Sequence, residues 1–214
     1  MPYAVYIALW FTVTIPALVG IVSYRRLLPS TRIIVILMCL GFLTELLLRL
    51  TAHTGSNIYI INVYTCIETL LLAFFFSKIV AGNRAKQIVK LAGVIVFCSI
   101  IVEMIFEGIN VWVSFSSSLE SIYIIAVGLY YFYEVAMVIN PDTPSSSCDF
   151  WLTAIILFYF MSSLEYFLLN RYLVDVSRPD LMMLGNIHTF VNAFCNLAYG
   201  LVLWKFTRSY SLAQ

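Results

Sequence analysis

Polar side chains that could bind a ligand stand inside long apolar stretches of this sequence. An ionisable or amide side chain in hydrocarbon is costly, so such residues are typical of ligand sites, proton paths or contacts between helices. We predict a ligand-binding site built from eight of them. These are Glu45, Arg49, Asn62, Glu68, Glu165, His188, Asn192 and Asn196.

The stretch "IHTFVNAFCNLAYGLVLWK" carries His188, Asn192 and Asn196 at intervals of four residues. Residues four apart lie on one face of an α-helix, and Tyr199 extends the same face. The spacing therefore predicts a helix with one polar stripe directed to the interior of a helical bundle. Hydrogen bonding between helices is the alternative role for Asn192 and Asn196.

The acidic residues of the predicted site outnumber its positive charges. Glu45 and Arg49 are spaced i,i+4 and can neutralise each other. Glu68 and Glu165 then remain, with His188 as the other group that could carry a positive charge. Because an isolated buried charge is very costly, we expect at least one glutamate to be neutral, or water or a cationic ligand to reach the site.

Metal and cofactor chemistry are not favoured by the residue pattern. His53 and His188 are the two histidines, whereas zinc and haem sites draw on more histidine or cysteine ligands. The five cysteines stand far apart without a C-x-x-C pair, and no glycine-rich phosphate loop is present. Lys205 stands at the end of an apolar stretch, so it is not expected to form a Schiff base. We expect no cofactor and no metal.

The composition indicates an integral membrane protein. Of the 214 residues, 62% are apolar and 11% are charged, whereas a soluble domain carries roughly a quarter charged residues. The net charge of +1 and the absence of a basic block argue against a nucleic-acid partner. The lipid bilayer is therefore the first expected partner, in a cell membrane such as the bacterial inner membrane.

Apolar stretches of about twenty residues predict membrane-spanning helices. We expect an all-α, seven-helix bundle that forms a single domain over residues 1–214. The predicted spans are 3–24, 33–50, 59–80, 89–106, 119–139, 150–169 and 187–206. Pro16 is expected to bend the first span, and "RYLVDVSRPDLMMLGN" is expected to form a long loop that could act as a partial lid.

Lysine and arginine residues near the span ends predict the orientation, because they are enriched in cytoplasmic loops. Nine of the twelve lie at one set of span ends: Arg25, Arg26, Arg32, Lys78, Arg84, Lys86, Lys90, Lys205 and Arg208. The other three are Arg49, Arg171 and Arg178. This distribution predicts that the N-terminus is outside and the C-terminus is cytoplasmic.

With this orientation, the predicted site lies in the outer half of the membrane. At about 1.5 Å per residue, Glu68 falls near the midplane. Glu103 and Glu120 are expected close to the outer interface. Glu134 is the one acidic residue expected in the inner half.

Two short motifs resemble those of the intramembrane CAAX-processing proteases. "ELLLR" (residues 45–49) is similar to the E-E-x-x-x-R element, and "HTFVN" (residues 188–192) is similar to H-x-x-x-N. The resemblance implies that Glu45 activates water and that His188 stabilises an oxyanion. Thr44 stands where that family has its first glutamate, and the predicted spans hold no second histidine.

At the level of pattern and size, the whole chain resembles small seven-helix bacterial membrane proteins, some of which are associated with sensor kinases. The stretches "NVYTCIETLLLAFFF" and "IHTFVNAFCNLAYGLVLW" carry this resemblance. It implies a sensing or accessory role and assigns no functional residue.

A receptor-like or sensory module is the leading functional hypothesis. It would bind a small or lipid-derived ligand in an outward-facing polar pocket and signal to a membrane or cytoplasmic partner. The alternative is a proton- or cation-coupled transporter or channel that uses Glu45, Glu68, Glu134 and Glu165. An intramembrane protease-like enzyme and a scaffold without a ligand are further alternatives.

Overall fold

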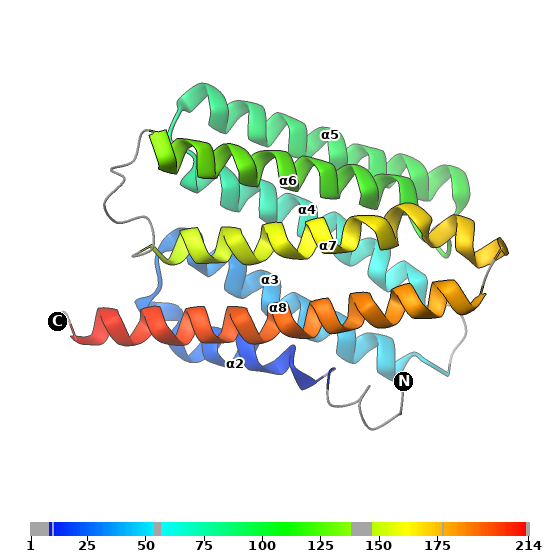
Figure 1. Ribbon diagram of the computed structural model, residues 1–214, viewed down its shortest axis with the longest axis horizontal. Coiled ribbons are helices and arrows are strands. Elements are labelled where there is room, and N and C mark those ends of the chain that lie inside the picture. Colours follow the sequence, from blue (N-terminus) through cyan, green and yellow to red (C-terminus); the bar gives the residue numbers. More distant parts are fainter. Residues whose placement is uncertain (1–8, 10, 54–56, 138–146, 177, 213–214) are drawn as a thin grey trace.

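The computed structural model describes residues 9, 11–53, 57–137, 147–176 and 178–212. Every regular element in these residues is helical (Figure 1), as the all-α prediction requires. The elements are α2 Thr14–Ser23, the 3-10 helix η1 Tyr24–Arg26, α3 Pro29–Leu50, α4 Ile58–Ile79, α5 Asn83–Glu107, α6 Ser114–Met137, α7 Cys148–Val176 and α8 Arg178–Leu212.

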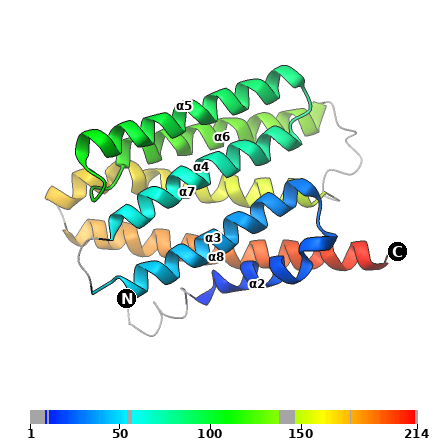
Figure 2. The same cartoon turned by 180° about the vertical axis from the view of Figure 1, so that it is seen from behind.

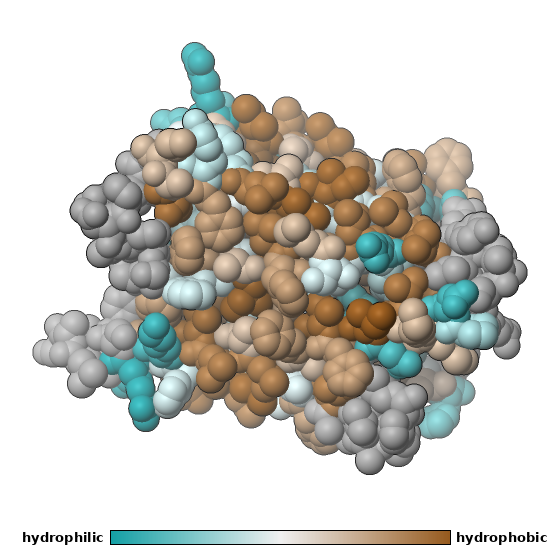
Figure 3. Space-filling view, viewed as in Figure 1, coloured by the Kyte–Doolittle hydropathy of each residue, from teal (hydrophilic) through white to brown (hydrophobic). Residues whose placement is uncertain are grey.

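Six of these helices, α3 to α8, are long and apolar enough to cross a membrane. Large apolar side chains remain exposed along them, for example Leu91, Ile105 and Leu201. Figure 3 shows apolar side chains across the middle of one face and hydrophilic ones mainly toward its left and right ends. An apolar belt of this kind matches a bilayer, so the chain is a multi-pass membrane protein.

The first predicted span, residues 3–24, lies partly outside the described residues. Within the described part, a turn precedes Thr14, and Pro16 lies in the first turn of α2. Because proline has no N–H, it cannot bond the Thr12 carbonyl, and the Ile15 amide bonds this carbonyl at 3.2 Å instead. Pro16 thus lies at an interruption of the helix, where the sequence predicted a bend.

Several helices, besides α8 described below, begin earlier than their apolar stretches indicated. Helix α3 begins at Pro29, α5 at Asn83 and α6 at Ser114. Hydropathy detects the part of a helix that matches hydrocarbon, whereas a polar first turn can continue beyond it, where water or a neighbouring side chain satisfies its amides. Pro29 also suits a first helical position, because its missing N–H has no intrahelical partner there.

The predicted long loop between the last two spans is wrong. Helix α7 continues to Val176 and α8 begins at Arg178, so residue 177 alone separates them. Pro179 and Asp180 lie in the first turn of α8. Proline is tolerated there, and an acidic side chain is favourable near the positive end of the helix dipole. The "RPD" sequence therefore starts a helix, and no lid forms from it.

The helices form a ring around the interior of the bundle. Helix α2 packs between α3 and α8, and the ring continues through α4, α6 and α7. Helix α5 lies outside this ring against α4 and α6 (Figure 2). Helical glycines allow close crossings, because a Cβ at Gly93 would lie 2.5 Å from Ala73 and one at Gly128 would lie 2.7 Å from Leu157.

Successive long helices run in opposite directions, so the bundle has two distinct ends (Figure 1). We call one the basic end. It holds η1, the start of α3, the α4–α5 connection and the C-terminal part of α8. The opposite end holds the α3–α4 and α5–α6 connections and the junction of α7 with α8. All nine basic residues that predict the orientation belong to elements near the basic end.

Polar contacts fasten helices together near the basic end. Asp149 at the start of α7 accepts hydrogen bonds from the Ser30 hydroxyl (2.8 and 3.0 Å) and the Thr31 hydroxyl (3.2 Å) of α3. Glu134 of α6 accepts a 2.9 Å bond from the amide of Ala81 in the α4–α5 connection. Both carboxylates accept hydrogen bonds from neighbouring elements, and these bonds explain why the two side chains can lie inside the bundle.

Candidate ligand-binding site

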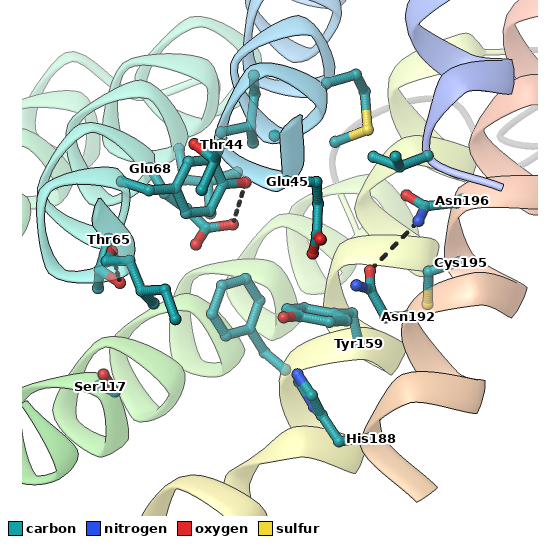
Figure 4. Close-up of a pocket in the computed structure, with 18 of the residues that line it drawn as sticks. Thr44, Glu45, Thr65, Glu68, Ser117, Tyr159, His188, Asn192, Cys195 and Asn196 are labelled. Carbon is teal, nitrogen blue, oxygen red and sulfur yellow. Dashed lines mark hydrogen bonds between the residues drawn. The ribbon is translucent and has the colours of Figure 1, made fainter. Parts of the chain in front are cut away.

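A cavity of about 200 Å³ lies inside the ring, in the half of the bundle next to the opposite end. Helices α3, α4, α6, α7 and α8 line it, and Figure 4 shows side chains from several of them converging on one space. Its polar lining consists of Thr44, Glu45, Tyr64, Thr65, Glu68, Ser117, Glu120, Tyr159, His188, Asn192, Cys195, Asn196 and Tyr199.

The stripe on α8 faces this cavity. His188, Asn192, Asn196 and Tyr199 all line it, as their helical spacing predicts. Asn196 donates to the Asn192 side-chain oxygen over 3.5 Å, a long and therefore weak hydrogen bond (Figure 4). His188, Asn192 and Asn196 also line a neighbouring recess of about 140 Å³ beside the start of α2. The polar face of α8 thus borders both spaces.

His188 is held in place by the helix beside it. Its Nδ1 lies 3.0 Å from the Ser163 Oγ on α7. Its ring stacks on Tyr166, with centroids 4.7 Å apart and planes 14° apart, and lies edge-on to Phe167 at 5.6 Å. Because Nδ1 is engaged by Ser163, Nε2 is the ring nitrogen that can serve a ligand or a water molecule.

Glu45 and Glu68 reach the cavity from α3 and α4, and Figure 4 shows Glu68 on the side of the cavity away from Asn192 and Asn196. Glu68 accepts a hydrogen bond from the Tyr64 hydroxyl over 3.3 Å. The two residues lie one turn apart on α4, so the tyrosine accompanies the carboxylate on the same face. Two of the predicted site carboxylates therefore share one cavity.

Glu120 also lines the cavity, although it was not among the predicted site residues. It is 2% exposed, and its Oε1 accepts a 2.6 Å bond from the Thr69 hydroxyl. The sequence predicted Glu120 near the interface because the apolar stretch starts at residue 119. Helix α6 starts at Ser114, so Glu120 lies about 9 Å beyond the start of the helix and not in its first turn. The serine run at residues 116–118, whose small side chains a helix can bury, was the available sequence signal for this longer helix.

Asn62 does not line the cavity but holds a loop that does. Its fully buried amide donates to the carbonyls of Ile109 (2.9 Å) and Val111 (2.8 Å), in the connection between α5 and α6. This connection turns at Gly108, whose φ of 97° lies in the region that favours glycine. It carries Trp112, which lines the cavity. Asn62 is therefore a positioning residue for this wall.

Glu165 and Arg49 are not part of the cavity lining. Glu165 is exposed on α7, although the sequence placed it in the site. Glu165 lies two residues from both Ser163 and Phe167, whose side chains face the interior of the bundle. Each helical residue turns the side-chain direction by about 100°, so a residue two positions away points to the opposite face of the helix. Arg49 is partly buried on α3, one turn beyond Glu45 toward the opposite end.

Glu103 has a structural task at the start of α6. Its Oε1 accepts from the Phe115 amide (3.2 Å) and its Oε2 from the Ser116 amide (2.7 Å). These are amides of the first turn, which have no partner within the helix. Glu103 on α5 thus caps α6, and its position near a helix start explains why a carboxylate is buried there.

Among the described residues, no group of three or more His, Cys, Asp and Glu is placed to hold a metal ion. The cavity therefore offers separate carboxylate, amide and imidazole groups around an aromatic and aliphatic wall. The chain matches no protein family, no curated protein and no solved structure.

Proposed function

We propose that this protein is a receptor-like or sensory membrane module that binds a small ligand in the cavity. The observation that carries the proposal is the cavity itself, which five helices line with polar groups. Buried polar groups in a membrane protein are costly unless they serve one another or a ligand. Because five helices contact the occupant, a change of occupancy can shift their packing and so reach a membrane or cytoplasmic partner.

We further propose that the basic end faces the cytoplasm and the cavity opens toward the outside of the cell membrane. Nine lysine and arginine residues belong to the basic end, against three near the opposite end. Basic residues near span ends favour the cytoplasmic side. The ligand would then arrive from the outer side, as expected of a sensor of external or lipid-derived molecules.

The transporter alternative is less well supported. A transporter needs a polar path from the cavity to the basic end. The residues between the cavity and the basic end include four fully buried apolar ones, Ile34, Phe75, Phe76 and Leu152. Glu134, the acidic residue that such a path would use, already accepts a hydrogen bond from the α4–α5 connection. The described residues therefore favour a binding site that is closed toward the basic end.

Filling the cavity tests whether it holds a ligand. Thr44 lines the cavity from the middle of α3, so Thr44→Phe adds bulk to the space. Leu43→Phe is the matched control, because Leu43 is 46% exposed on the outer face of the same helix. We expect native mass spectrometry to find a bound small molecule on the parent and on Leu43→Phe, and none on Thr44→Phe.

Hydrogen–deuterium exchange tests the sensory part of the proposal. With ligand bound, exchange should slow around the cavity and also change at the basic ends of α3 and α8, which leave the cavity in that direction. Thr44→Phe should abolish both effects. A response restricted to the cavity, with none at the basic end, would support a binding protein but contradict a sensor. Equal small-molecule content in Thr44→Phe and Leu43→Phe would contradict the binding site.

A further inference from the structure

We propose that the cavity selects a small organic cation, such as a protonated amine carried on a short apolar body. This inference rests on the proposed function and specifies its ligand class. Three carboxylates line the cavity, Glu45, Glu68 and Glu120, and none of the lining residues is a lysine or arginine. A low-dielectric space lined by one sign of charge concentrates ligands of the opposite sign.

Two of these carboxylates have acceptor capacity left for a ligand. Glu120 is 2% exposed and receives one hydrogen bond, from the neutral Thr69 hydroxyl to Oε1. Glu68 receives one long bond, from the neutral Tyr64 hydroxyl, also to Oε1. No described residue donates to Oε2 of either side chain. A buried carboxylate with an oxygen left over is costly, and an ammonium group supplies the missing donors and the opposite charge.

The rest of the wall suits the apolar body of such a ligand. Aromatic rings line the cavity from several sides: Tyr64, Trp112, Tyr159, Phe160, Phe167 and Tyr199. The faces of aromatic rings attract ammonium groups, and their area favours an apolar body over a hydrated inorganic ion. At about 200 Å³ the cavity is below the range of roughly 300–1,000 Å³ for drug-sized ligands, so the ligand is small.

A metal cation is not the occupant that this geometry favours. A metal ion needs several ligands around one point, and the described residues hold no group of three or more His, Cys, Asp and Glu so placed. An organic cation has several N–H groups and a body several ångströms long, so it can contact separated carboxylates in turn. The amides of Asn192 and Asn196, across the cavity, can serve further polar groups of the ligand.

Three probes of the same shape and different charge test this inference in nanodisc-embedded protein. Phenylpropylamine is the cation, phenylpropionate the anion and phenylpropanol the neutral analogue. We expect the amine alone to raise the unfolding temperature of the parent and to bind in calorimetry. Glu68→Gln and Glu120→Gln should each weaken amine binding at least tenfold, whereas Glu165→Gln, on the exposed face of α7, should not change it.

Glu68→Asp keeps the charge and should retain the preference for the amine, which separates loss of charge from loss of fold. Equal binding of the three probes, or an unchanged affinity in both glutamine variants, overturns the cation inference. If the neutral or anionic probe binds and Thr44→Phe blocks it, the proposed binding function stands and only the ligand class is wrong. If no probe binds and Thr44→Phe carries as much small molecule as Leu43→Phe, both proposals fail.

Discussion

Removal of the Glu103 side chain should destabilise the bundle through the start of α6. The four amides of the first turn are all satisfied in the structure. The Ser114 amide bonds the Trp112 carbonyl (2.9 Å) and the Ser117 amide bonds the Val113 carbonyl (3.0 Å). The other two, of residues 115 and 116, bond Glu103. Glu103→Ala leaves these two donors without acceptors.

The expected loss follows from the burial of each donor. The hydrogen bond from the Ser116 amide is buried, and a buried donor left unsatisfied costs about 1–3 kcal/mol. The one from the Phe115 amide is partly buried, so water can replace it at roughly 0.5–1 kcal/mol. Loss of the buried charge offsets part of this sum. We expect Glu103→Ala to lower the free energy of unfolding by about 2 kcal/mol, and Glu103→Gln, which keeps one acceptor, by about half as much.

Equilibrium unfolding in mixed detergent micelles measures these differences. Glu165→Ala is the control, because Glu165 is exposed on α7 and its removal should stay within about 0.5 kcal/mol. Hydrogen exchange gives the local readout, since the amides of Phe115 and Ser116 should exchange faster in Glu103→Ala. The capping role would be refuted if Glu103→Ala and Glu165→Ala were equally stable and these two amides stayed protected.

Two further substitutions test the packing and the cavity wall. Gly93→Ala should cost about 1–3 kcal/mol of unfolding free energy, because its Cβ would lie 2.5 Å from Ala73. Gly185→Ala, whose nearest neighbouring atom would be 3.9 Å away, should be tolerated, and equal stability of the two variants would contradict the crossing of α4 and α5. Asn62→Leu removes both hydrogen bonds to the α5–α6 connection and should red-shift the emission of Trp112, measured by difference from a Trp112→Phe background. An unchanged Trp112 spectrum would mean that the amide does not position this wall.

The burial pattern gives the acidic residues three different tasks, although all stand in apolar surroundings in the sequence. Glu45, Glu68 and Glu120 line the cavity, Glu103 and Glu134 satisfy backbone amides, and Glu165 is exposed. This division separates residues whose substitution should change ligand binding from those whose substitution should change stability. It also provides Glu165 as a carboxylate control for both kinds of experiment.

Sequence alone was sufficient for the properties that depend on neighbouring residues in the chain. Apolar stretches of about twenty residues identified the six long helices, because a bilayer of fixed thickness demands that length. The spacing of His188, Asn192, Asn196 and Tyr199 identified the cavity face of α8, because helical periodicity is local. The ligand, the partner and the orientation stay predictions.

The tertiary structure decided which faces of the other helices meet and where each helix begins. In a membrane bundle, apolar side chains face both lipid and neighbouring helices, so the hydrophobic pattern does not show which face points inward. Glu165 and Glu120 illustrate the consequence. Glu165 was expected in the site and points away from it, whereas Glu120 was expected at the interface and lies within the cavity wall. Their places depend on the packing of α6 and α7 against other helices, which residues distant in the sequence determine.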